Sequence, residues 1–326
     1  MRTRRLAAAV LALATAVCLV ACGGQREPEA GGTGTDGGRL TIATGNTTGV
    51  YYQLGGALAS VISDKVEGYR ATASETGASV QNIQGLTAGN YDIAFSLGDT
   101  ASDAVKGQNS FQQPQDVVAL TRLYPNYTQV AVRASAGVTK FADLKGKRIS
   151  TGSPNSGTEV IARRLLTAAG LDPARDVTTQ RLGLPESVDA MKSGSIDALV
   201  WSGGIPTGGI TDLTTSLGKD VKLIPITDLL PALNTKYGTI YAEGTIPAAA
   251  YKQPGDVKTI IVPNVLLVRK NMPDELAEKL TKVIFDNLDA LVQVNAAAKD
   301  ITLETAAQTD PVPLHPGAKK AFDALK

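Results

Sequence analysis

Two stretches of this chain that start about 107 residues apart have nearly the same layout, and this duplication constrains the fold most. Residues 42–49 (IATGNTTG) lead into helical periodicity over residues 52–62, and residues 149–158 (ISTGSPNSGT) lead into the same periodicity over residues 160–169. Each stretch predicts a strand, a small polar loop and a helix. Such a loop leaves backbone N–H groups unshielded at a helix N-terminus, where the dipole adds roughly half a positive charge. Two copies therefore predict two lobes that close on one small acidic solute.

A second pair of segments supports the duplication. Residues 86–95 and 191–200 both have a helix end, a glycine at the C-cap position, an aspartate and then an apolar strand. Their offset is about 105 residues, close to that of the first pair. From Leu40 onward, strand-like apolar runs alternate with helical patterns, which is typical of α/β lobes with helices on both faces of each sheet. We therefore interpret the chain as a two-lobed repeat.

The N-terminus has the layout of an export signal. Three arginines within residues 2–5 precede an apolar run, residues 6–20, that is too short for a permanent membrane helix. The run ends in Leu-Val-Ala-Cys-Gly at residues 19–23, which resembles the bacterial lipobox. We therefore expect residues 1–21 to be a lipoprotein signal peptide, Cys22 to carry the lipid, and residues 22–38 to form a flexible tether. The protein would then be exported and anchored to the outer face of the cytoplasmic membrane.

Composition excludes several classes of function. Loss of residues 1–21 removes three of the 32 basic residues and no acidic one, so 29 remain against 31 acidic residues, and nucleic-acid binding is not expected. Cys18 leaves with the signal, so Cys22 alone can form neither a disulfide nor a thiolate metal site. His315 is the only histidine and lies in a Pro-Leu-His-Pro-Gly turn, where we expect a structural role. We therefore expect a monomer with no catalytic residue, no cofactor and no metal.

The strands divide the chain into three segments. Residues 127–133 and 260–268 are long β-rich runs that we expect to cross between the lobes, because a lobe inserted in another must be left and re-entered. The predicted first lobe comprises residues 39–133 and 256–326, and the second comprises residues 134–255. The other expected strands are residues 40–44, 93–96 and 118–120 in the first lobe, and in the second lobe a strand at Ile149 and strands over residues 198–201 and 221–225. Apolar positions between Leu276 and Leu291 predict one long amphipathic helix after the return.

The candidate binding residues follow predicted strands, where the ligand crevice of an open α/β sheet lies. Gly49, Val50 and Tyr51 open the first helix, and the Tyr51 hydroxyl could donate to a carboxylate. Residues 74–80 form a second polar loop before a helix, with a plain N-cap as the alternative. Asp99 could bind an ammonium group or cap the following helix. The other candidates in these first-lobe loops are Thr76, Gly77, Ala78, Ser96 and Leu97.

The second lobe contributes two loops. Residues 152–158 have the G-x-x-x-x-G spacing of a phosphate loop but continue without the lysine that a triphosphate requires, which favours a single carboxylate over a nucleotide. Residues 201–207 contain the only tryptophan, whose indole could line a pocket and offer one N–H donor, or simply pack in the core. The candidates here are Asn155, Ser156, Gly157, Thr158, Trp201, Gly203 and Gly204.

From about Leu40 to the C-terminus, the chain resembles the TAXI class of extracytoplasmic receptors that serve TRAP transporters. The matching segments are residues 48–52, 75–82, 123–125, 152–158, 201–207, 262–266 and 313–317. The resemblance implies a type II periplasmic-binding-protein-like α/β fold, with two lobes joined by two crossing strands and a ligand cleft between them. It also implies that a small carboxylate such as glutamate, glutamine or 2-oxoglutarate is delivered to TRAP transporter membrane subunits without chemistry. After the strand at Ile93 the family often has a glutamine that this chain lacks, which leaves the particular ligand open.

Two other functions remain open at this stage. One is binding of a neutral or heterocyclic solute, such as a thiamine-precursor pyrimidine, with Trp201 and Tyr51 stacking on a ring. The other is an exported hydrolase that uses Glu75 and Asp99 as an acid/base pair, for which the two carboxyl groups would have to lie roughly 5–9.5 Å apart in a cleft.

Overall fold

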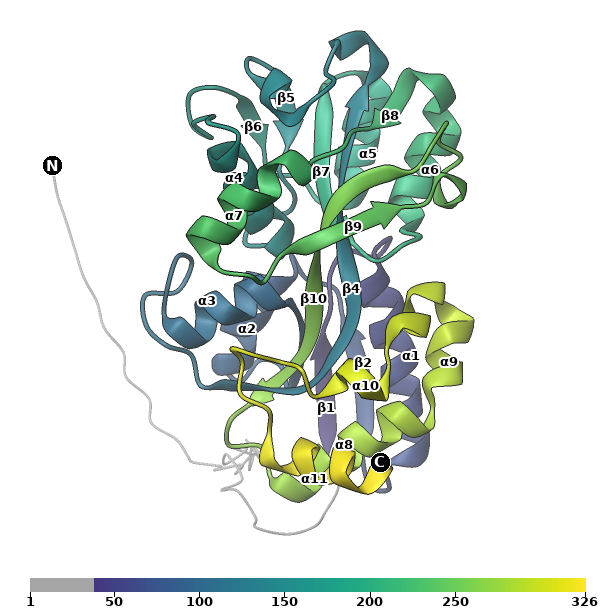
Figure 1. Cartoon of the computed structure of the whole chain (residues 1–326). Coiled ribbons are helices and arrows are strands. Elements are labelled where there is room, and N and C mark those ends of the chain that lie inside the picture. Colours follow the sequence, from purple (N-terminus) through teal and green to yellow (C-terminus); the bar gives the residue numbers. More distant parts are fainter. Residues whose placement is uncertain (1–37) are drawn as a thin grey trace, which may run out of the picture. The chain divides into compact units, whose positions relative to one another are not determined.

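The computed structural model describes residues 38–326, which contain a mixed ten-stranded sheet with helices on both faces (Figure 1). The strand order is β2-β1-β3-β10-β4-β7-β5-β6, and β8 and β9 pair with β4 and β10 respectively. The predicted α/β class with two lobes and two crossing strands is confirmed. The expected signal peptide, the lipidated Cys22 and the tether up to residue 37 lie outside the described residues. No helix in the described part of the chain is both long and apolar enough to cross a membrane.

The first lobe has a parallel sheet that is covered on both faces. Its strand β3 (Ile93–Leu97) is buried at every position, as expected for a parallel strand between two helical layers. The stripe of apolar residues on α1 (Val50–Lys65) packs on one face of this sheet. The remaining elements are β1 (Arg39–Ala43), β2 (Arg70–Ser74), α2 (Ser79–Thr87), α3 (Gly98–Lys106), α8 (Asp274–Asp286), α9 (Leu288–Val294), α10 (Leu303–Ala306) and α11 (Pro316–Leu325).

The second lobe repeats the same arrangement. In it β5 (Arg148–Ser150) pairs in parallel with β6 (Thr178–Gln180) and with β7 (Ala198–Gly203). Its helices are α4 (Gly157–Ala168), α5 (Leu184–Ser193), α6 (Gly208–Leu217) and α7 (Leu230–Tyr237), and its remaining strands are β8 (Val221–Leu223) and β9 (Ala242–Ile246). The expected strand at residues 221–225 is thus two residues shorter than predicted.

Two long antiparallel strands run through both lobes (Figure 1): β4 (Val117–Arg133) and β10 (Val257–Arg269). The prediction of two crossing strands is therefore confirmed, but the separate strands expected at residues 118–120 and 127–133 are one strand. Pro125 lies opposite Pro263 at the junction. Neither proline has an N–H group, so the ladder loses two donors at the point where the lobes meet. This local weakening of the pairing is consistent with a hinge.

The single long helix expected over residues 276–291 is in fact two helices, α8 and α9. Asn287 separates them with φ −130° and ψ 27°, outside the helical region. Its side-chain amide donates to the carbonyl of Val283 at 2.8 Å, which satisfies an acceptor at the end of α8. The apolar periodicity continues through this break because both helices cover the same core, and periodicity alone therefore did not reveal it.

Four clusters of buried apolar side chains form the core, two in each lobe. Leu97, at the end of the first-lobe strand β3, belongs to a second-lobe cluster together with Ile161 and Leu165 of α4. The two lobes are therefore in apolar contact at this point. The described residues also form one compact unit, and the lobe boundaries given above stay a prediction.

His315 caps the last helix, α11. Its Nδ1 atom accepts a hydrogen bond from the Gly317 N–H at 3.0 Å, so Nε2 is the protonated nitrogen and donates to the Met272 carbonyl at 3.0 Å. The ring is fully buried. Both nitrogen atoms serve the backbone, and the side chain is held away from the cavity described next.

Candidate functional site

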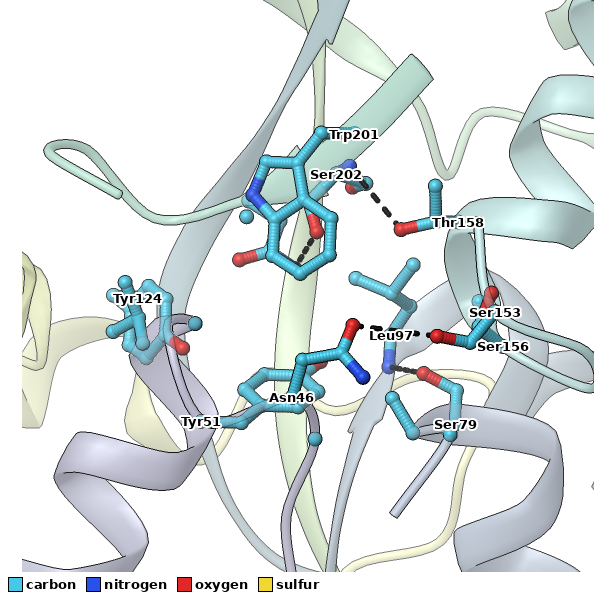
Figure 2. A pocket seen from close by; sticks show the side chains of 18 residues that line it. Asn46, Tyr51, Ser79, Leu97, Tyr124, Ser153, Ser156, Thr158, Trp201 and Ser202 are labelled. Atoms are coloured by element: carbon cyan, nitrogen blue, oxygen red, sulfur yellow. Dashed lines mark hydrogen bonds between the residues drawn. The ribbon is translucent and has the colours of Figure 1, made fainter. Parts of the chain in front are cut away.

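A cavity lies where the two lobes meet the crossing strands, and Figure 2 shows the 18 residues that line it. Its volume is about 30 Å³, against the roughly 10–15 Å³ that one water needs on the same measure. At this volume it accommodates only a small solute. The lining residues are Gly45, Asn46, Gly49, Val50, Tyr51, Gly77, Ala78, Ser79, Leu97, Tyr124, Asn126, Ser153, Ser156, Gly157, Thr158, Trp201, Ser202 and Gly203.

Three helices begin at this cavity: α1 after Gly49, α2 after Ala78 and α4 after Ser156. In α1 the first N–H group that donates to a backbone carbonyl of the helix is that of Gln53, which donates to the Gly49 carbonyl at 3.5 Å. In α4 the first such N–H group is that of Val160, which donates to the Ser156 carbonyl at 3.2 Å. The preceding first-turn amides are oriented along the helix axes and add partial positive charge. The two lobes thus provide helix N-termini to one cavity.

Three hydroxyl groups of the lining accept hydrogen bonds from the backbone. Ser79 Oγ accepts from the Leu97 N–H at 3.0 Å, Ser156 Oγ from the Glu159 N–H at 2.9 Å, and Thr158 Oγ1 from the Ser202 N–H at 3.2 Å. A hydroxyl has one proton to donate, and a backbone N–H occupies one of its acceptor positions. These three side chains therefore keep their own protons for a further acceptor.

A hydrogen-bond chain on the crossing strands sets the direction of two more groups. Both protons of the Asn264 amide are used, by the Tyr124 carbonyl at 2.8 Å and by Asn126 Oδ1 at 2.8 Å. Asn264 Oδ1 must then be the acceptor for the Tyr51 hydroxyl, which donates to it. The expectation that this hydroxyl donates to the ligand is therefore wrong in this structure. Asn126 has its oxygen occupied and presents its amide nitrogen, which approaches the Ser202 carbonyl at 3.4 Å.

Two buried hydroxyls of the lining, Tyr124 Oη and Ser202 Oγ, have no hydrogen-bond partner among the described residues. Tyr124 is fully buried and Ser202 is 6% exposed. Leaving a buried hydroxyl unpaired costs about 1–3 kcal/mol, so such groups in a cavity indicate a missing partner. Burial also raises the pKa of Tyr124 well above its ordinary value, which keeps this hydroxyl protonated as a donor at neutral pH.

Trp201 covers one side of the cavity above Asn46 and Tyr51 (Figure 2). Its indole N–H donates to Thr207 Oγ1 at 3.1 Å, and Thr207 in turn donates to the Gly204 carbonyl at 2.6 Å. The indole proton is therefore not free for a ligand, contrary to the expectation, and the ring contributes an apolar face. A Cβ at Gly49 would lie 3.4 Å from this ring, so the glycine lets the indole approach α1 closely.

The structure brings together 11 of the 16 predicted binding residues in the lining: Gly49, Val50, Tyr51, Gly77, Ala78, Leu97, Ser156, Gly157, Thr158, Trp201 and Gly203. The other five, Thr76, Ser96, Asp99, Asn155 and Gly204, are not part of it. Thr76 Oγ1 instead donates to Asn82 Oδ1 at 2.6 Å. Ser96 is next to Leu97 on β3 but lies outside the lining, because successive residues of a strand face opposite sides. Its hydroxyl donates to the Leu97 carbonyl at 3.0 Å.

Asn155 and Gly204 have structural roles next to the cavity. Asn155 is exposed with φ 59°, and its carbonyl accepts from the Gln81 N–H at 3.0 Å. This bond joins α4's loop in the second lobe to α2 in the first. A Cβ on Gly204 would lie 2.9 Å from Tyr124 and 3.2 Å from Val50, so this glycine permits close packing.

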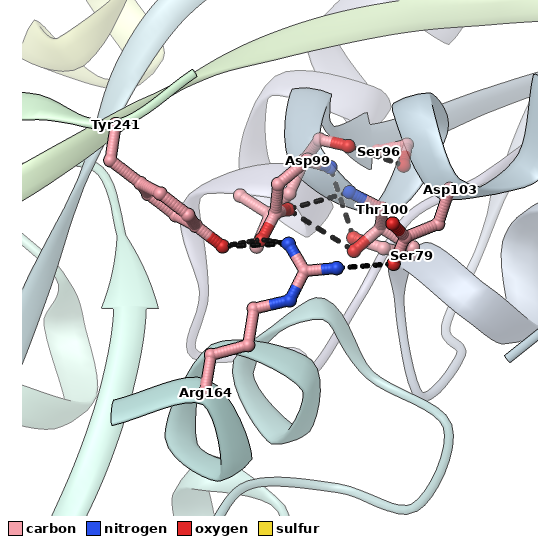
Figure 3. Close-up of polar contacts among 8 residues, drawn as sticks. Ser79, Ser96, Asp99, Thr100, Asp103, Arg164 and Tyr241 are labelled. Carbon is pink, nitrogen blue, oxygen red and sulfur yellow. Dashed lines mark hydrogen bonds and ion pairs between the residues drawn. The ribbon is translucent and has the colours of Figure 1, made fainter. Parts of the chain in front are cut away.

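Asp99 lies in a buried ion cluster between the lobes, shown in Figure 3. Arg164 of α4 contacts Asp99 at 3.3 Å, donates to Tyr241 at 2.9 Å and binds Asp103, so one guanidinium lies between two carboxylates of α3. Asp99 is 1% exposed, Arg164 5% and Asp103 6%. Neither an ammonium ligand nor an acid/base role is therefore open to Asp99. Glu75, the partner proposed for a hydrolase, is exposed and outside the cavity.

The pKa values in this cluster follow from burial and from the shared charge. Burial opposes the charged form of Arg164, but Asp99, Tyr241 and Asp103 together raise its pKa above the ordinary value. Burial raises the pKa of the Asp103 carboxyl, and Arg164 opposes that shift. Tyr241 has its pKa raised well above 10.0, first by burial and then by Asp99. We refer to Asp99, Asp103, Arg164 and Tyr241 as the interlobe cluster.

Sequence reasoning missed seven lining residues: Gly45, Asn46, Ser79, Tyr124, Asn126, Ser153 and Ser202. Five of them lie inside loops or helix starts that were identified, next to the residues chosen. Tyr124 and Asn126 flank Pro125 on a crossing strand, in the gap between two runs that were interpreted as separate strands. Polar residues beside a proline in an otherwise apolar strand were the available signal.

The sequence model of the NMT1-like family matches residues 42–323 of this chain. The chain belongs to the NMT1-like family. Similar solved structures include the binding protein of an ABC phosphonate transporter from Pseudomonas aeruginosa, with TM-score 0.55, 14% identity and 88% of this chain and 95% of that chain covered. PhnD1 from Prochlorococcus marinus in complex with methylphosphonate has TM-score 0.54, 11% identity and coverages of 81% and 90%. This member of the NMT1-like family therefore has the fold of the type II periplasmic binding proteins.

Proposed function

We propose that this protein is an extracytoplasmic solute-binding protein that captures a small carboxylate between its two lobes. The observation that carries the proposal is the donor content of the cavity. First-turn amides of α1 and α4, the hydroxyls of Ser79, Ser156 and Thr158, and the unpaired hydroxyls of Tyr124 and Ser202 line one small space. A carboxylate supplies the acceptors that these donors lack.

The absence of a charged lining residue does not argue against an anion. No Asp, Glu, Lys, Arg or His occurs among the lining residues of the described chain. An anion held by several oriented N–H and O–H groups is stabilised by charge-assisted hydrogen bonds and by helix dipoles, each worth more in a buried cavity than in water. Such a site favours a single small carboxylate over a nucleotide, as the missing lysine of the phosphate-loop-like segment also suggests.

We further propose that the protein is a TAXI receptor of a TRAP transporter and delivers its solute to the membrane subunits. The motif resemblance between residues 48 and 317 and the lipobox-like sequence before Cys22 support this. The mature protein would be a monomer with residues 22–38 as a tether to the outer face of the cytoplasmic membrane. Palmitate labelling of cells that express the wild type and Cys22→Ser tests the anchor, since only the wild type should be labelled and membrane-bound.

Isothermal titration of the purified protein with glutamate, glutamine, 2-oxoglutarate and succinate tests the binding function. We expect saturable binding of at least one of them, with a Kd in the micromolar range or tighter. Mass spectrometry of the native protein should identify the same class of acid if a solute is retained through purification. If none of these small organic acids binds, the proposal is refuted.

Two variants test whether the unpaired hydroxyls bind the solute. Tyr124→Phe and Ser202→Ala each remove one donor to a charged group, so we expect the Kd to rise about 10- to 100-fold. Tyr52→Phe is the matched control, because Tyr52 lies on α1 beside Tyr51 but is 36% exposed and outside the lining. Its Kd should equal that of the wild type.

A neutral heteroaromatic solute is the second candidate, because Trp201 and Tyr51 both present aromatic rings to a cavity without charged side chains. Stacking on these rings would supply the affinity. Competition between organic acids and a hydroxymethylpyrimidine decides between the two candidates. If the pyrimidine binds and no acid displaces it, the heterocyclic solute is favoured.

A further inference from the structure

We infer that the solute carries a carboxylate but no ammonium group, so that the protein selects oxo, hydroxy or unsubstituted acids over amino acids. This inference rests on the proposed function and narrows its substrate class. An amino acid brings three ammonium protons into the site, and each needs an acceptor once the lobes have closed. The question is therefore which acceptors face the cavity.

The side-chain oxygens of the lining are largely occupied. Asn46 Oδ1 accepts from Ser153 Oγ at 3.3 Å and from the Leu184 N–H at 3.0 Å. Asn126 Oδ1 accepts from Asn264 at 2.8 Å. Their amide nitrogens can only donate, and that of Asn126 uses one of its two protons toward the Ser202 carbonyl at 3.4 Å. The three hydroxyls that accept from backbone N–H groups keep their own protons. The acceptors left to a solute are neutral hydroxyl oxygens, such as that of Ser153, which donates its proton to Asn46, and no carboxylate oxygen lines the cavity.

Four backbone carbonyls at the cavity are also engaged. The Asn46 carbonyl accepts from the Gly49 N–H at 2.9 Å, and the Ser153 carbonyl accepts from the Ser156 N–H at 3.2 Å. The carbonyls of Ser202 and Gly203 are approached at 3.4 Å by the amides of Asn126 and Gln129. An ammonium group would have to displace or share these bonds.

The carboxylates that an ammonium would need are used elsewhere. Asp99 and Asp103 belong to the interlobe cluster, where Arg164 lies between them and neither lines the cavity. The aromatic rings of Trp201 and Tyr51 could attract a cation weakly. That attraction is smaller than the cost of removing an unpaired ammonium from water, so the balance is against an amino acid.

Titration of matched pairs of acids tests the inference directly. 2-Oxoglutarate is compared with L-glutamate, and succinate with L-aspartate, because each pair has the same carbon skeleton and differs by the amine. We expect the acid without the amine to bind about 100-fold tighter or better in the pair that fits. Equal or tighter binding of the amino acid would overturn the inference while leaving carboxylate capture intact. Failure of all four acids to bind would overturn the proposed function and this inference with it.

A pair of variants adds a second test, which compares the affinities for 2-oxoglutarate and L-glutamate before and after a charge is introduced. Ser202→Asp introduces an acidic acceptor at a lining position whose hydroxyl has no partner in the described chain, and Ser202→Asn has nearly the same size without charge. We expect Ser202→Asp to weaken 2-oxoglutarate more than L-glutamate, so that the Kd of L-glutamate divided by the Kd of 2-oxoglutarate falls at least about tenfold. Ser202→Asn should keep the wild-type ratio, and thermal melts of both variants confirm that they fold. An unchanged ratio in Ser202→Asp would contradict the inference.

Discussion

The interlobe cluster makes a quantitative prediction about closure. Arg164→Met removes the guanidinium that lies between Asp99 and Asp103 and leaves two carboxylates that are 1% and 6% exposed. Removing one partner of a buried ion pair costs about 3–5 kcal/mol, because the remaining charge is uncompensated. Asp99 and Asp103 come from the first lobe and Arg164 from the second, so hinge opening hydrates them and the cost falls on the closed form.

This cost should appear in ligand binding, because residues of both lobes line the proposed binding cavity. A penalty of about 3 kcal/mol raises the Kd about 100-fold, while the melting temperature of the ligand-free protein should change little. Arg163→Met is the control on the same helix, since its side chain is 66% exposed and contacts Glu159 at 3.9 Å. Glu159 is itself buried but keeps Arg181 as a partner at 2.6 Å, so loss of the exposed Arg163 side chain should cost roughly 0–1 kcal/mol and the Kd should stay within a factor of about three.

Isothermal titration with the tightest-binding acid, together with thermal melts with and without it, measures both effects. Adding Asp99→Asn and Asp103→Asn to Arg164→Met removes the uncompensated charges and should restore part of the affinity. If Arg164→Met bound like Arg163→Met, or if it destabilised the ligand-free protein by the full amount, the reasoning about closure would be refuted.

Three further predictions concern the lobe contact, its pH dependence and the C-terminal cap. Gly157→Ala places a Cβ against a Leu97 methyl across the lobes, so the Kd should rise at least about tenfold. Gly56→Ala is the control, because Gly56 on α1 has open space around it; it should leave the Kd unchanged and stabilise the fold by about 0.5–1 kcal/mol. Equal Kd values in titrations of the two variants would contradict this prediction. Burial raises the pKa of Asp103 from 3.8, so its contribution to the closed form is present in full below that value and is lost as pH rises through the raised pKa. Asp103→Asn should therefore flatten the rise of Kd with pH that begins above the ordinary pKa of 3.8, and an unchanged slope would count against the cluster as the cause. His315→Ala removes the cap of α11 and leaves the Met272 carbonyl unpaired, so urea unfolding should show a loss of about 1–3 kcal/mol and titration an unchanged Kd.

The repeated strand, polar loop and helix could be predicted from sequence because the pattern is local. Period and loop composition place a helix N-terminus after each of residues 42–49 and 149–158, and the end of a parallel strand is where such loops converge. The crossing strands were also predictable from their length and β-branched content. Periodicity failed at Asn287, where the apolar face continues across a break, and at residues 121–126, where polar side chains interrupt the apolar pattern of a continuous strand.

Only the tertiary structure decided how the polar groups of the site are used. Asp99 is paired with a residue 65 positions away, and the Tyr51 hydroxyl with one 213 positions away. A residue type states what a side chain can donate or accept, but its free capacity depends on partners brought close by folding. The sequence alone therefore determined the two lobes and the polar loops that lead into their helices. Long-range contacts decided which polar groups of the cavity remain free to contact a solute, because the partners that occupy the others lie far away in the sequence.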